Sequence, residues 1–184
     1  MSVHVRHRFT EAPTLETGRL RLRAHQPGDL SEYVLMWADP TVVRYTIGEP
    51  SPPQRTWMRL LGHRGHWSVL GFGYWAVEAK ETGRYIGELG FGYFKRDLHA
   101  SVDTVPELGW ALVPSAHGKG YATEALRAVL AWGEAHFESD RMVCIIDPGN
   151  DVSARVAGKL GFREYTRVAN KQGHAKILLE RYRG

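Results

Sequence analysis

Cysteine is nearly missing from this chain of 184 residues, because Cys144 is the only one. An intramolecular disulfide is therefore impossible. Cys144 lies in the apolar run Met142-Val143-Cys144-Ile145-Ile146, which is typical of a strand. We therefore expect its thiol to fill core volume rather than to react.

Long apolar runs are missing as well. No stretch approaches the roughly 20 apolar residues that a membrane-spanning helix needs, and residues 1–14 lack the apolar segment of a secretory signal. We therefore expect a cytoplasmic protein with no membrane partner. Residues 1–14 are predicted to be an untethered arm, and residues 15–184 a single domain large enough to bury a substantial core.

Neither sign of charge dominates. The chain has 24 Lys and Arg against 20 Asp and Glu, a formal net charge of +4. That mild excess suits a polyanionic cofactor, but no basic stripe with interleaved aromatic residues predicts a specific nucleic-acid partner. The nine histidines are scattered. His63 and His66 have the i, i+3 spacing of a helix face, but no Cys or carboxylate ligand set is evident around them, so no metal site is predicted.

Strands and helices alternate along the chain. The first helix is expected from Pro27-Gly28-Asp29 to about Asp39, the second over about Pro53–Arg64, and a short one over Asp151–Leu160. Alternation and β-favouring residues predict seven strands. They are Leu15–Ala24, Tyr74–Ala79, Tyr85–Phe94, Val102–Val113, Arg141–Ile146, Arg163–Ala169 and Ala175–Tyr182.

The most informative stretch joins the fourth strand to a glycine-rich turn and a helix. Apolar residues recur at helical spacing from Ala122, with Thr123 and Glu124 on the solvent-exposed face. A strand, a turn and a helix in this order direct free backbone N–H groups toward one point, which favours an anion. Gly118 and Gly120 allow a diphosphate to approach the backbone closely.

Three kinds of phosphate-binding loop have to be compared. A nucleoside-triphosphate P-loop is excluded, because Gly120 follows Lys119 where Ser or Thr is needed. A dinucleotide fold would use Asp147 for a ribose, but Thr123 occupies the third glycine position and too little chain follows. The third is the pyrophosphate loop of the GNAT acyltransferases, whose pattern falls on His117, Gly120 and Ala122. His117 departs from that pattern, which has Arg or Gln first.

Further motifs make the chain resemble the RimJ/RimL-like branch of that superfamily. The resemblance covers roughly Thr14 to Tyr182 and is specific for the family, not for a substrate. The motifs are Arg19-Leu20-Arg21-Leu22-Arg23, Gly71-Phe72-Gly73-Tyr74-Trp75-Ala76-Val77, Ile86-Gly87-Glu88-Leu89-Gly90, Gly118-Lys119-Gly120-Tyr121-Ala122-Thr123-Glu124-Ala125, Asn150-x-x-Ser153 and Lys159-Leu160-Gly161-Phe162.

The resemblance implies an α/β fold of the GNAT type. Its mixed, mostly antiparallel seven-stranded sheet would carry helices on both faces and would splay between strands four and five. The implied cofactor is acetyl-CoA, with a backbone N–H at Leu112 or Val113 polarising the thioester carbonyl and Asn150 as a further contact. The pyrophosphate would be held by the backbone N–H groups of His117, Gly118, Lys119, Gly120, Tyr121 and Ala122.

The resemblance also suggests catalytic residues. Glu107 is the first candidate for the base that removes a proton from an amine, and Glu88 is the second. Many relatives place a tyrosine acid where this chain has Ala157, whereas the RimJ/RimL branch resembles this chain in its hydroxyl at Ser153. Ser153 is therefore the candidate for stabilising the thiolate. Asn150 and Ser153 could instead simply cap the short helix.

The implied activity is N-acetylation of a primary amine, either a protein N-terminus or a small molecule, by direct attack in a ternary complex. The acceptor pocket is expected under the first two helices, where Trp37, Tyr45, Trp57 and Trp67 occur. A homodimer is left open. The alternative is a coenzyme-A-binding module without turnover, which Ala157 and His117 suggest.

Overall fold

The computed structural model describes residues 3–95, 98, 102, 104–169 and 173–184. Within them, eight strands form one sheet in the order β1-β2-β3-β4-β5-β6-β8-β7. Asp103, in the predicted fourth strand, lies outside the described residues. The strands are β1 (Leu15–Glu16), β2 (Leu20–Arg23), β3 (Tyr74–Ala79), β4 (Arg84–Gly92), β5 (Glu107–Leu112), β6 (Arg141–Ile146), β7 (Arg163–Ala169) and β8 (Ala175–Tyr182).

The sheet is mixed and mostly antiparallel, as predicted, because only β5 and β6 pair in parallel. It has eight strands instead of the predicted seven. The difference lies in Leu15–Ala24, where the backbone N–H of Thr17 donates to the carbonyl of Leu20 at 2.9 Å. That turn folds the first predicted strand into the hairpin β1–β2.

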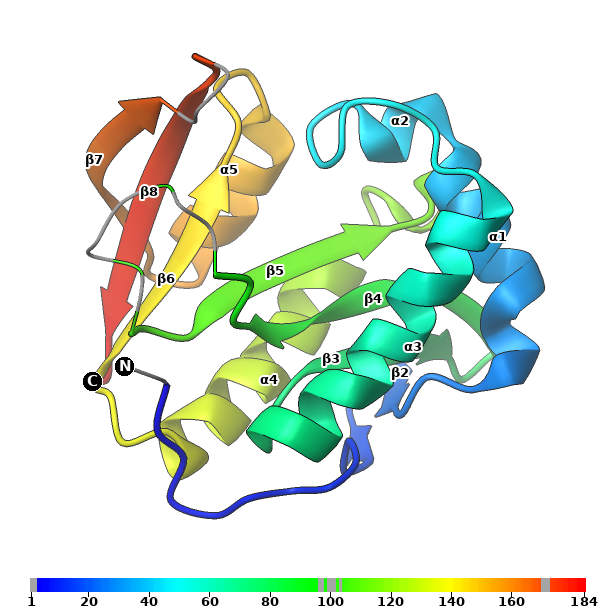
Figure 1. Cartoon of the computed structure of the whole chain (residues 1–184), viewed down its shortest axis with the longest axis horizontal. Coiled ribbons are helices and arrows are strands. Elements are labelled where there is room, and N and C mark those ends of the chain that lie inside the picture. Colours follow the sequence, from blue (N-terminus) through cyan, green and yellow to red (C-terminus); the bar gives the residue numbers. More distant parts are fainter. Residues whose placement is uncertain (1–2, 96–97, 99–101, 103, 170–172) are drawn as a thin grey trace.

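Helices cover both faces of the sheet. α3 crosses one face together with α1, and α4 lies on the other (Figure 1). Among the described residues, no helix combines the length and the apolar character needed to cross a lipid bilayer. The helices are α1 (Leu30–Ala38), α2 (Pro40–Val43), α3 (Pro53–Leu70), α4 (Tyr121–His136) and α5 (Asp151–Lys159), with 3-10 turns η1 (Pro27–Asp29) and η3 (Pro114–Ala116).

Two helical predictions need correction. The second helix was expected to end near Arg64, but α3 continues to Leu70 and is closed by Gly71 in the left-handed conformation at φ +82°. Residues 41–53 were expected to form a loop, yet α2 begins at Pro40 and extends to Val43. The carboxylate of Asp39 accepts a hydrogen bond from the backbone N–H of Thr41, which caps this short helix.

The N-terminal segment is held against the rest of the chain. The prediction of an untethered arm is therefore wrong. Val5 pairs with Phe137 in an isolated bridge. The backbone N–H of Arg6 donates to the carbonyl of His136 at 2.7 Å, and the indole N–H of Trp75 donates to the carbonyl of Pro13 at 2.7 Å. The domain boundary at residue 15 stays a prediction.

The predicted splay between strands four and five is present. These two strands are β5 and β6 in the structure. They share a single register pair, Glu107 with Val143. Beyond it β5 stays paired with β4 as far as Leu112, whereas β6 stays paired with β8. Figure 1 shows the two strands diverging from that point. The separation opens the sheet in its middle.

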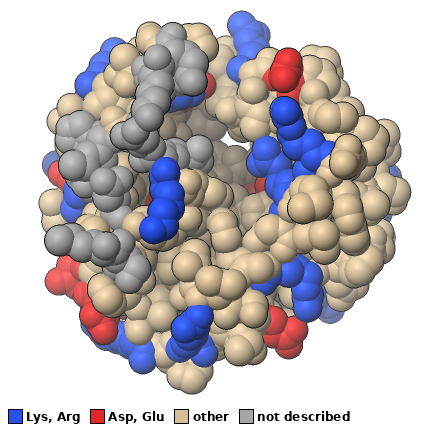
Figure 2. All heavy atoms as spheres, in the orientation of Figure 1, with Lys and Arg blue, Asp and Glu red and all other residues tan. Residues whose placement is uncertain are grey.

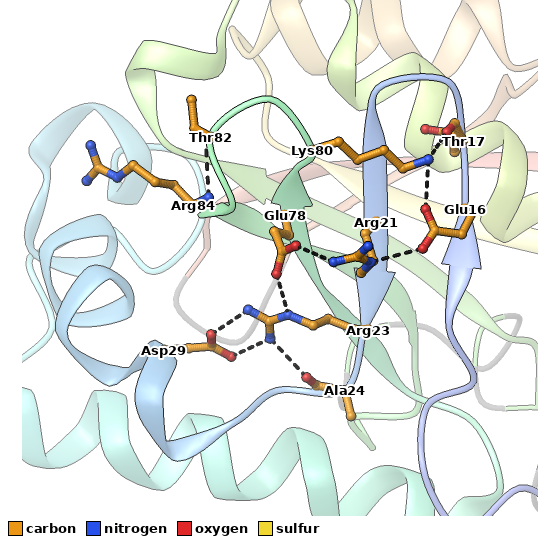
Figure 3. A network of polar contacts seen from close by, with 10 residues as sticks. All are labelled: Glu16, Thr17, Arg21, Arg23, Ala24, Asp29, Glu78, Lys80, Thr82 and Arg84. Atoms are coloured by element: carbon orange, nitrogen blue, oxygen red, sulfur yellow. Dashed lines mark hydrogen bonds and ion pairs between the residues drawn. The ribbon is translucent and has the colours of Figure 1, made fainter.

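The strand β2 alternates as predicted, with Leu20 and Leu22 fully buried. On the other face, Arg23 lies between two carboxylates (Figure 3). Its two terminal nitrogens donate to both oxygens of Asp29 at 2.9 and 2.7 Å, and its Nε donates to Glu78 at 2.9 Å. These contacts raise the pKa of Arg23 further above its ordinary value, with the hydrogen bonds to Asp29 as the largest cause.

Arg23→Lys should therefore lower the free energy of unfolding by about 1–3 kcal/mol, because an ammonium group cannot reproduce the two-pronged contact with Asp29. Arg21→Lys is the matched control. The Arg21 side chain is 47% exposed, against 16% for Arg23, so its replacement should lower the free energy of unfolding clearly less than that of Arg23. Urea denaturation measures both, and equal losses would contradict this account.

Candidate active site

The predicted cofactor loop adopts the backbone conformation that close approach of an anion requires. Gly118 and Gly120 have φ of +74° and +78°, which side chains with a Cβ rarely adopt. The first hydrogen bond of α4 joins the N–H of Glu124 to the carbonyl of Gly120 at 3.1 Å. The N–H groups of the preceding turn therefore point out of the helix end, where the helix dipole favours negative charge.

Of the residues predicted to bind the pyrophosphate through their backbone N–H groups, His117 does not direct its N–H toward the anion site. The backbone N–H of His117 donates to the carbonyl of Pro114 at 3.0 Å. Its imidazole Nε2 lies 2.9 Å from the carbonyl oxygen of Leu112. His117 therefore fastens the loop to the end of β5.

Glu124 is the main anchor of the loop. We expected it on the solvent-exposed face of α4, but its side chain is only 21% exposed. One carboxylate oxygen accepts hydrogen bonds from the hydroxyl of Thr17 at 2.6 Å and from the N–H of Arg19 at 2.9 Å. The other accepts from Arg19 Nε at 2.7 Å. Burial alone would raise the pKa of Glu124, but the bonds from Thr17 and Arg19 lower it below its ordinary value.

Arg19 carries this anchorage into the loop itself. Its Nη1 donates to the carbonyl of Lys119 at 3.0 Å, and its guanidinium lies 4.6 Å from the ring centre of Tyr121. The β1–β2 hairpin thus fixes both the loop and the first residue of α4. A hollow beside the loop includes three basic side chains among its lining residues. These residues are Arg19, Gly120, Thr123, Glu124, Arg127 and Lys159.

The two predicted carbonyl-polarising donors differ in their surroundings. The N–H of Val113 donates to the carbonyl of Ile86 at 3.0 Å, so β4 already occupies it. Successive backbone groups of a strand point to opposite sides. The N–H of Leu112 therefore points away from β4, toward the gap that β6 has left. Of the two, Leu112 is the one whose N–H faces the gap.

A cavity of about 840 Å³ lies where β5 and β6 part, and Figure 2 shows a hollow in this face with Lys and Arg side chains along one side. It brings Glu107 together with Asn150 and Ser153, which lie far from Glu107 in the sequence. Its walls include residues of α3 (Arg55, Met58, Arg59, Gly62, His63, His66), of β4 and β5 (Glu88, Glu107, Leu108, Gly109, Trp110, Ala111), and of β6, α5 and β8 (Ile145, Ile146, Asn150, Ser153, Lys176).

The four aromatic residues expected at the acceptor pocket divide into two pairs. Trp37 and Tyr45 line the cavity, whereas Trp57 and Trp67 are not among its lining residues. Trp67 belongs to the core, where its indole N–H donates to the carbonyl of Tyr74 at 2.9 Å. The sequence could not separate the two pairs because all four side chains are large and apolar.

Asn150 and Ser153 both border the cavity and begin α5. The side-chain oxygen of Asn150 accepts a hydrogen bond from the N–H of Ser153 at 3.1 Å, so the predicted helix cap is present. Glu107, the first residue of β5, is 9% exposed. Cys144 is 1% exposed, and burial, reinforced by the charge of Glu107, raises the pKa of its thiol. The thiol is thus a core group, as predicted.

Glu88 lies in a buried polar cluster that the sequence did not reveal. One of its oxygens accepts a hydrogen bond from the hydroxyl of Tyr33 at 2.7 Å and lies 3.2 Å from His25 Nε2. The same oxygen lies 3.0 Å from His63 Nε2. The prediction that no carboxylate surrounds His63 is therefore wrong. We name Tyr33, His25, His63 and Glu88 the Glu88 cluster.

The Glu88 cluster contains three potential metal ligands, since nitrogen or oxygen atoms of His25, His63 and Glu88 lie within 4.8 Å of one another. The oxygen of Glu88 that faces both imidazoles already accepts the hydroxyl of Tyr33. The 3.2 Å contact from His25 is a hydrogen bond. The 3.0 Å contact from His63 lacks hydrogen-bond geometry, and His63 Nε2 has no hydrogen-bond partner among the described residues. No local pattern could have indicated this group, because its members come from four separate elements or loops.

Burial sets the charge states within the cluster. It lowers the pKa of His25, which keeps that ring neutral. Burial would raise the pKa of Glu88, but His63 and His25 outweigh it and hold that pKa well below its ordinary value. Burial also raises the pKa of Tyr33 far above its ordinary value, with the charge of Glu88 adding to it. Tyr33 therefore remains a hydrogen-bond donor.

A glycine fixes the position of the cluster against β5. The ring of His63 is stacked between those of His25 and Tyr74, with centres 4.8 and 4.9 Å away. A Cβ on Gly109 would lie 1.9 Å from the hydroxyl oxygen of Tyr74. A side chain at position 109 would therefore displace Tyr74, and with it the stacked rings of His63 and His25 beside the cavity.

Comparison with known proteins gives the context of this geometry. The family model described as "Acetyltransferase (GNAT) domain" matches residues 19–163. The uncharacterised protein YkkB of Bacillus subtilis is 32% identical over 169 residues, which cover 91% of this chain and 94% of YkkB. The uncharacterised N-acetyltransferase p20 of Bacillus licheniformis is 26% identical over 152 residues, 82% of this chain and 83% of p20.

Solved structures agree with the family match. An acetyltransferase from Agrobacterium tumefaciens superposes with a TM-score of 0.77 at 27% identity, over 94% of this chain and 96% of that one. At 14% identity, RimL, a ribosomal L7/L12 acetyltransferase solved with coenzyme A, shares the fold with a TM-score of 0.74, over 93% of this chain and 98% of that one. The chain belongs to the GNAT family and is an N-acetyltransferase that uses acetyl-CoA.

Proposed function

We propose that this enzyme transfers the acetyl group of acetyl-CoA to a primary amine by direct attack of the amine in a ternary complex. The observation that carries the proposal is the cavity where β5 leaves β6. Glu107 lines it, and β5, which forms one of its walls, runs on to Leu112 and the loop before α4. One site would thereby accept an amine on one side and a thioester on the other.

The residues around the loop fit a diphosphate. A Cβ placed on Gly118 would meet nothing within 4 Å, so the loop faces open space. The N–H groups of Gly118, Lys119, Gly120, Tyr121 and Ala122 would bind the pyrophosphate, and Arg19, Arg127 and Lys159 would neutralise further phosphate charge. When bound, acetyl-CoA supplies the activated acetyl group. The N–H of Leu112 would donate to the carbonyl oxygen of that group.

Glu107 is the better of the two candidate bases. An alkylammonium has a pKa near 10.4, so the amine must lose a proton before it can attack. Glu88 is engaged by Tyr33 and His25, and its depressed pKa makes it a weak proton acceptor. Glu88 would instead hold His63 in place beside the cavity.

Ser153 would assist the departing thiolate with a hydrogen bond. A thiol of pKa near 8.5 needs only modest help, so an acid as strong as the tyrosine found elsewhere in the superfamily is dispensable here. Asn150 would orient the start of α5, and with it Ser153, through its cap.

A place in the RimJ/RimL-like branch is supported by the motifs quoted above and by the shared fold. Among structures of that fold are RimL and a spermidine N-acetyltransferase from Vibrio cholerae, so a protein N-terminus and a small amine both remain acceptor classes. A coenzyme-A-binding module without turnover is less favoured, because the cavity offers a carboxylate where an amine would lose its proton.

Thiol release from acetyl-CoA in the presence of primary amines tests the proposal. Wild-type enzyme should release thiol with at least one amine, and Glu107→Gln should lower kcat by about 100-fold or more, because proton removal then depends on water. The acid limb of the pH–rate profile should flatten in this variant. Tight binding of coenzyme A without turnover on a broad panel of amines would favour the module instead.

Glu124→Gln tests the anchorage of the loop. The loss of a charged partner for Arg19 and Thr17 should weaken coenzyme A binding by about tenfold, measured by isothermal titration. Glu138→Gln, an exposed change beyond the end of the same helix, should leave the affinity within about twofold. Equal affinities of the two variants would show that Glu124 does not support the cofactor site.

The charge states of the Glu88 cluster predict how stability depends on pH. The pKa values of His25 and Glu88 are both lower in the folded protein than in the unfolded chain. The unfolded chain therefore binds more protons as the pH falls, first through the ordinary pKa of His25 near 6.5 and then through that of Glu88 near 4.5. The free energy of unfolding should fall over this range.

The variant His25→Gln separates the two contributions. It should reduce the decline between about pH 7 and pH 5.5, where His25 titrates in the unfolded chain and Glu88 does not, and should leave the decline below pH 5. Urea denaturation at half-unit steps measures both curves. An unchanged slope between pH 7 and 5.5 would show that His25 is not held neutral.

A further inference from the structure

Arg59 lines the cavity and makes no hydrogen bond within the part of the chain that the structure describes. It is half-buried on α3, and its guanidinium carbon lies 4.0 Å from the ring centre of Trp37. Among the described residues its buried Nε has no hydrogen-bond partner, and no carboxylate lies within 4.0 Å of the guanidinium. A guanidinium has five N–H donors, and a buried donor without an acceptor is costly.

The neighbouring turn of α3 adds a second cation to the same wall. Arg55 precedes Arg59 by four residues and therefore lies on the same helix face. Its contact with Glu49 is loose, at 3.8 Å between side chains that are 62% and 75% exposed. Such a pair contributes little, so Arg55 is free to turn toward the cavity that both arginines line.

Negative charge lies on other walls of the cavity. Asp147 is neutralised by Lys176 at 2.6 Å. Glu88 faces Tyr33 and the two imidazoles of its cluster. Glu107 lies on β5, across from α3. A cationic wall and a separate carboxylate thus share one cavity, an arrangement complementary to a molecule with both charges.

We propose that the acceptor is a primary amine that also carries a carboxylate or a phosphonate, and that Arg59 binds this anionic group while the amine faces Glu107. The inference rests on the proposed function and specifies its substrate class. Stacking on Trp37 holds the guanidinium plane in place, which leaves its edge to form two parallel hydrogen bonds to an oxyanion. A polyamine is disfavoured, because its second ammonium group would meet Arg59 and Arg55.

Matched amines that differ only in the anionic group test the inference. Glycine, β-alanine and 4-aminobutanoate are compared with ethanolamine, 3-aminopropanol and 4-aminobutanol, with 2-aminoethylphosphonate as a further anion. Thiol release should give kcat/KM at least about tenfold higher for the best acid than for its alcohol. Arg59→Gln should remove this preference, mainly through KM, and leave the alcohols within about twofold.

Arg163→Gln is the matched control, because Arg163 is an exposed residue of β7 that does not line the cavity. It should retain the preference for acids, and Arg59→Lys should retain part of it. Thermal melting of each variant checks that the fold is intact. Equal rates for every acid and its alcohol in the wild type would overturn the inference, as would an equal loss on both series in a folded Arg59→Gln enzyme.

Binding measurements distinguish failure of the proposed acetyl transfer from failure of the inference about the acceptor. If no amine is acetylated although coenzyme A binds, the proposed transfer to an amine is wrong. Equilibrium titration of the same pairs into the protein with coenzyme A then decides the inference. Tighter binding of the acids, lost in Arg59→Gln, upholds it, and equal binding of acids and alcohols overturns it.

Discussion

The parting of β5 from β6 after a single shared register pair is the constraint on which the active site depends. Parallel strands normally exchange backbone hydrogen bonds along their whole length, and each bond given up must find another partner. Here β5 keeps β4 on one side and β6 keeps β8, so the sheet remains continuous elsewhere. The backbone edge of β5 that β6 leaves uncovered faces the cavity, and in the proposed reaction a bound thioester would use it.

Two carboxylates near that opening are largely removed from water, one at the cofactor loop and one beside the cavity. The carboxylate of Glu124 joins three parts of the chain, namely the N-terminal hairpin, the loop and α4, through donors from Thr17 and Arg19. The carboxylate of Glu88 gathers Tyr33 and two imidazoles beneath the cavity. Each carboxylate is matched by several donors, which is the condition under which a buried charge is tolerated.

Much of the fold could be predicted because its signals are local. The alternation in Arg19–Arg23, the glycines before α4 and the paired prolines around β5 each indicate their own structure without reference to the rest. The splay and the family followed from motifs that span nearly the whole chain. The split of the first strand was missed because a turn at Thr17–Arg19 interrupts a pattern that still alternates on both sides.

The parts of the site that could not be predicted depend on contacts between distant residues. Glu124 has the spacing of a solvent-exposed helix residue, and only the hairpin packed against it removes it from water. His25, His63 and Glu88 have no shared spacing. No sequence pattern marks Arg59, because its stacking on Trp37 is a tertiary contact. Sequence patterns report on faces of single elements and not on which faces meet.

The anchorage of the loop also bears on how the protein is made. Arg19 and Glu124 are separated by 105 positions along the chain. During synthesis the β1–β2 hairpin leaves the ribosome long before α4. The contacts between Arg19 and Glu124 can form only after α4 has also been made. Since contacts of such long range close late, the ability to bind a nucleotide should arise near the end of synthesis, after most of the sheet has been translated.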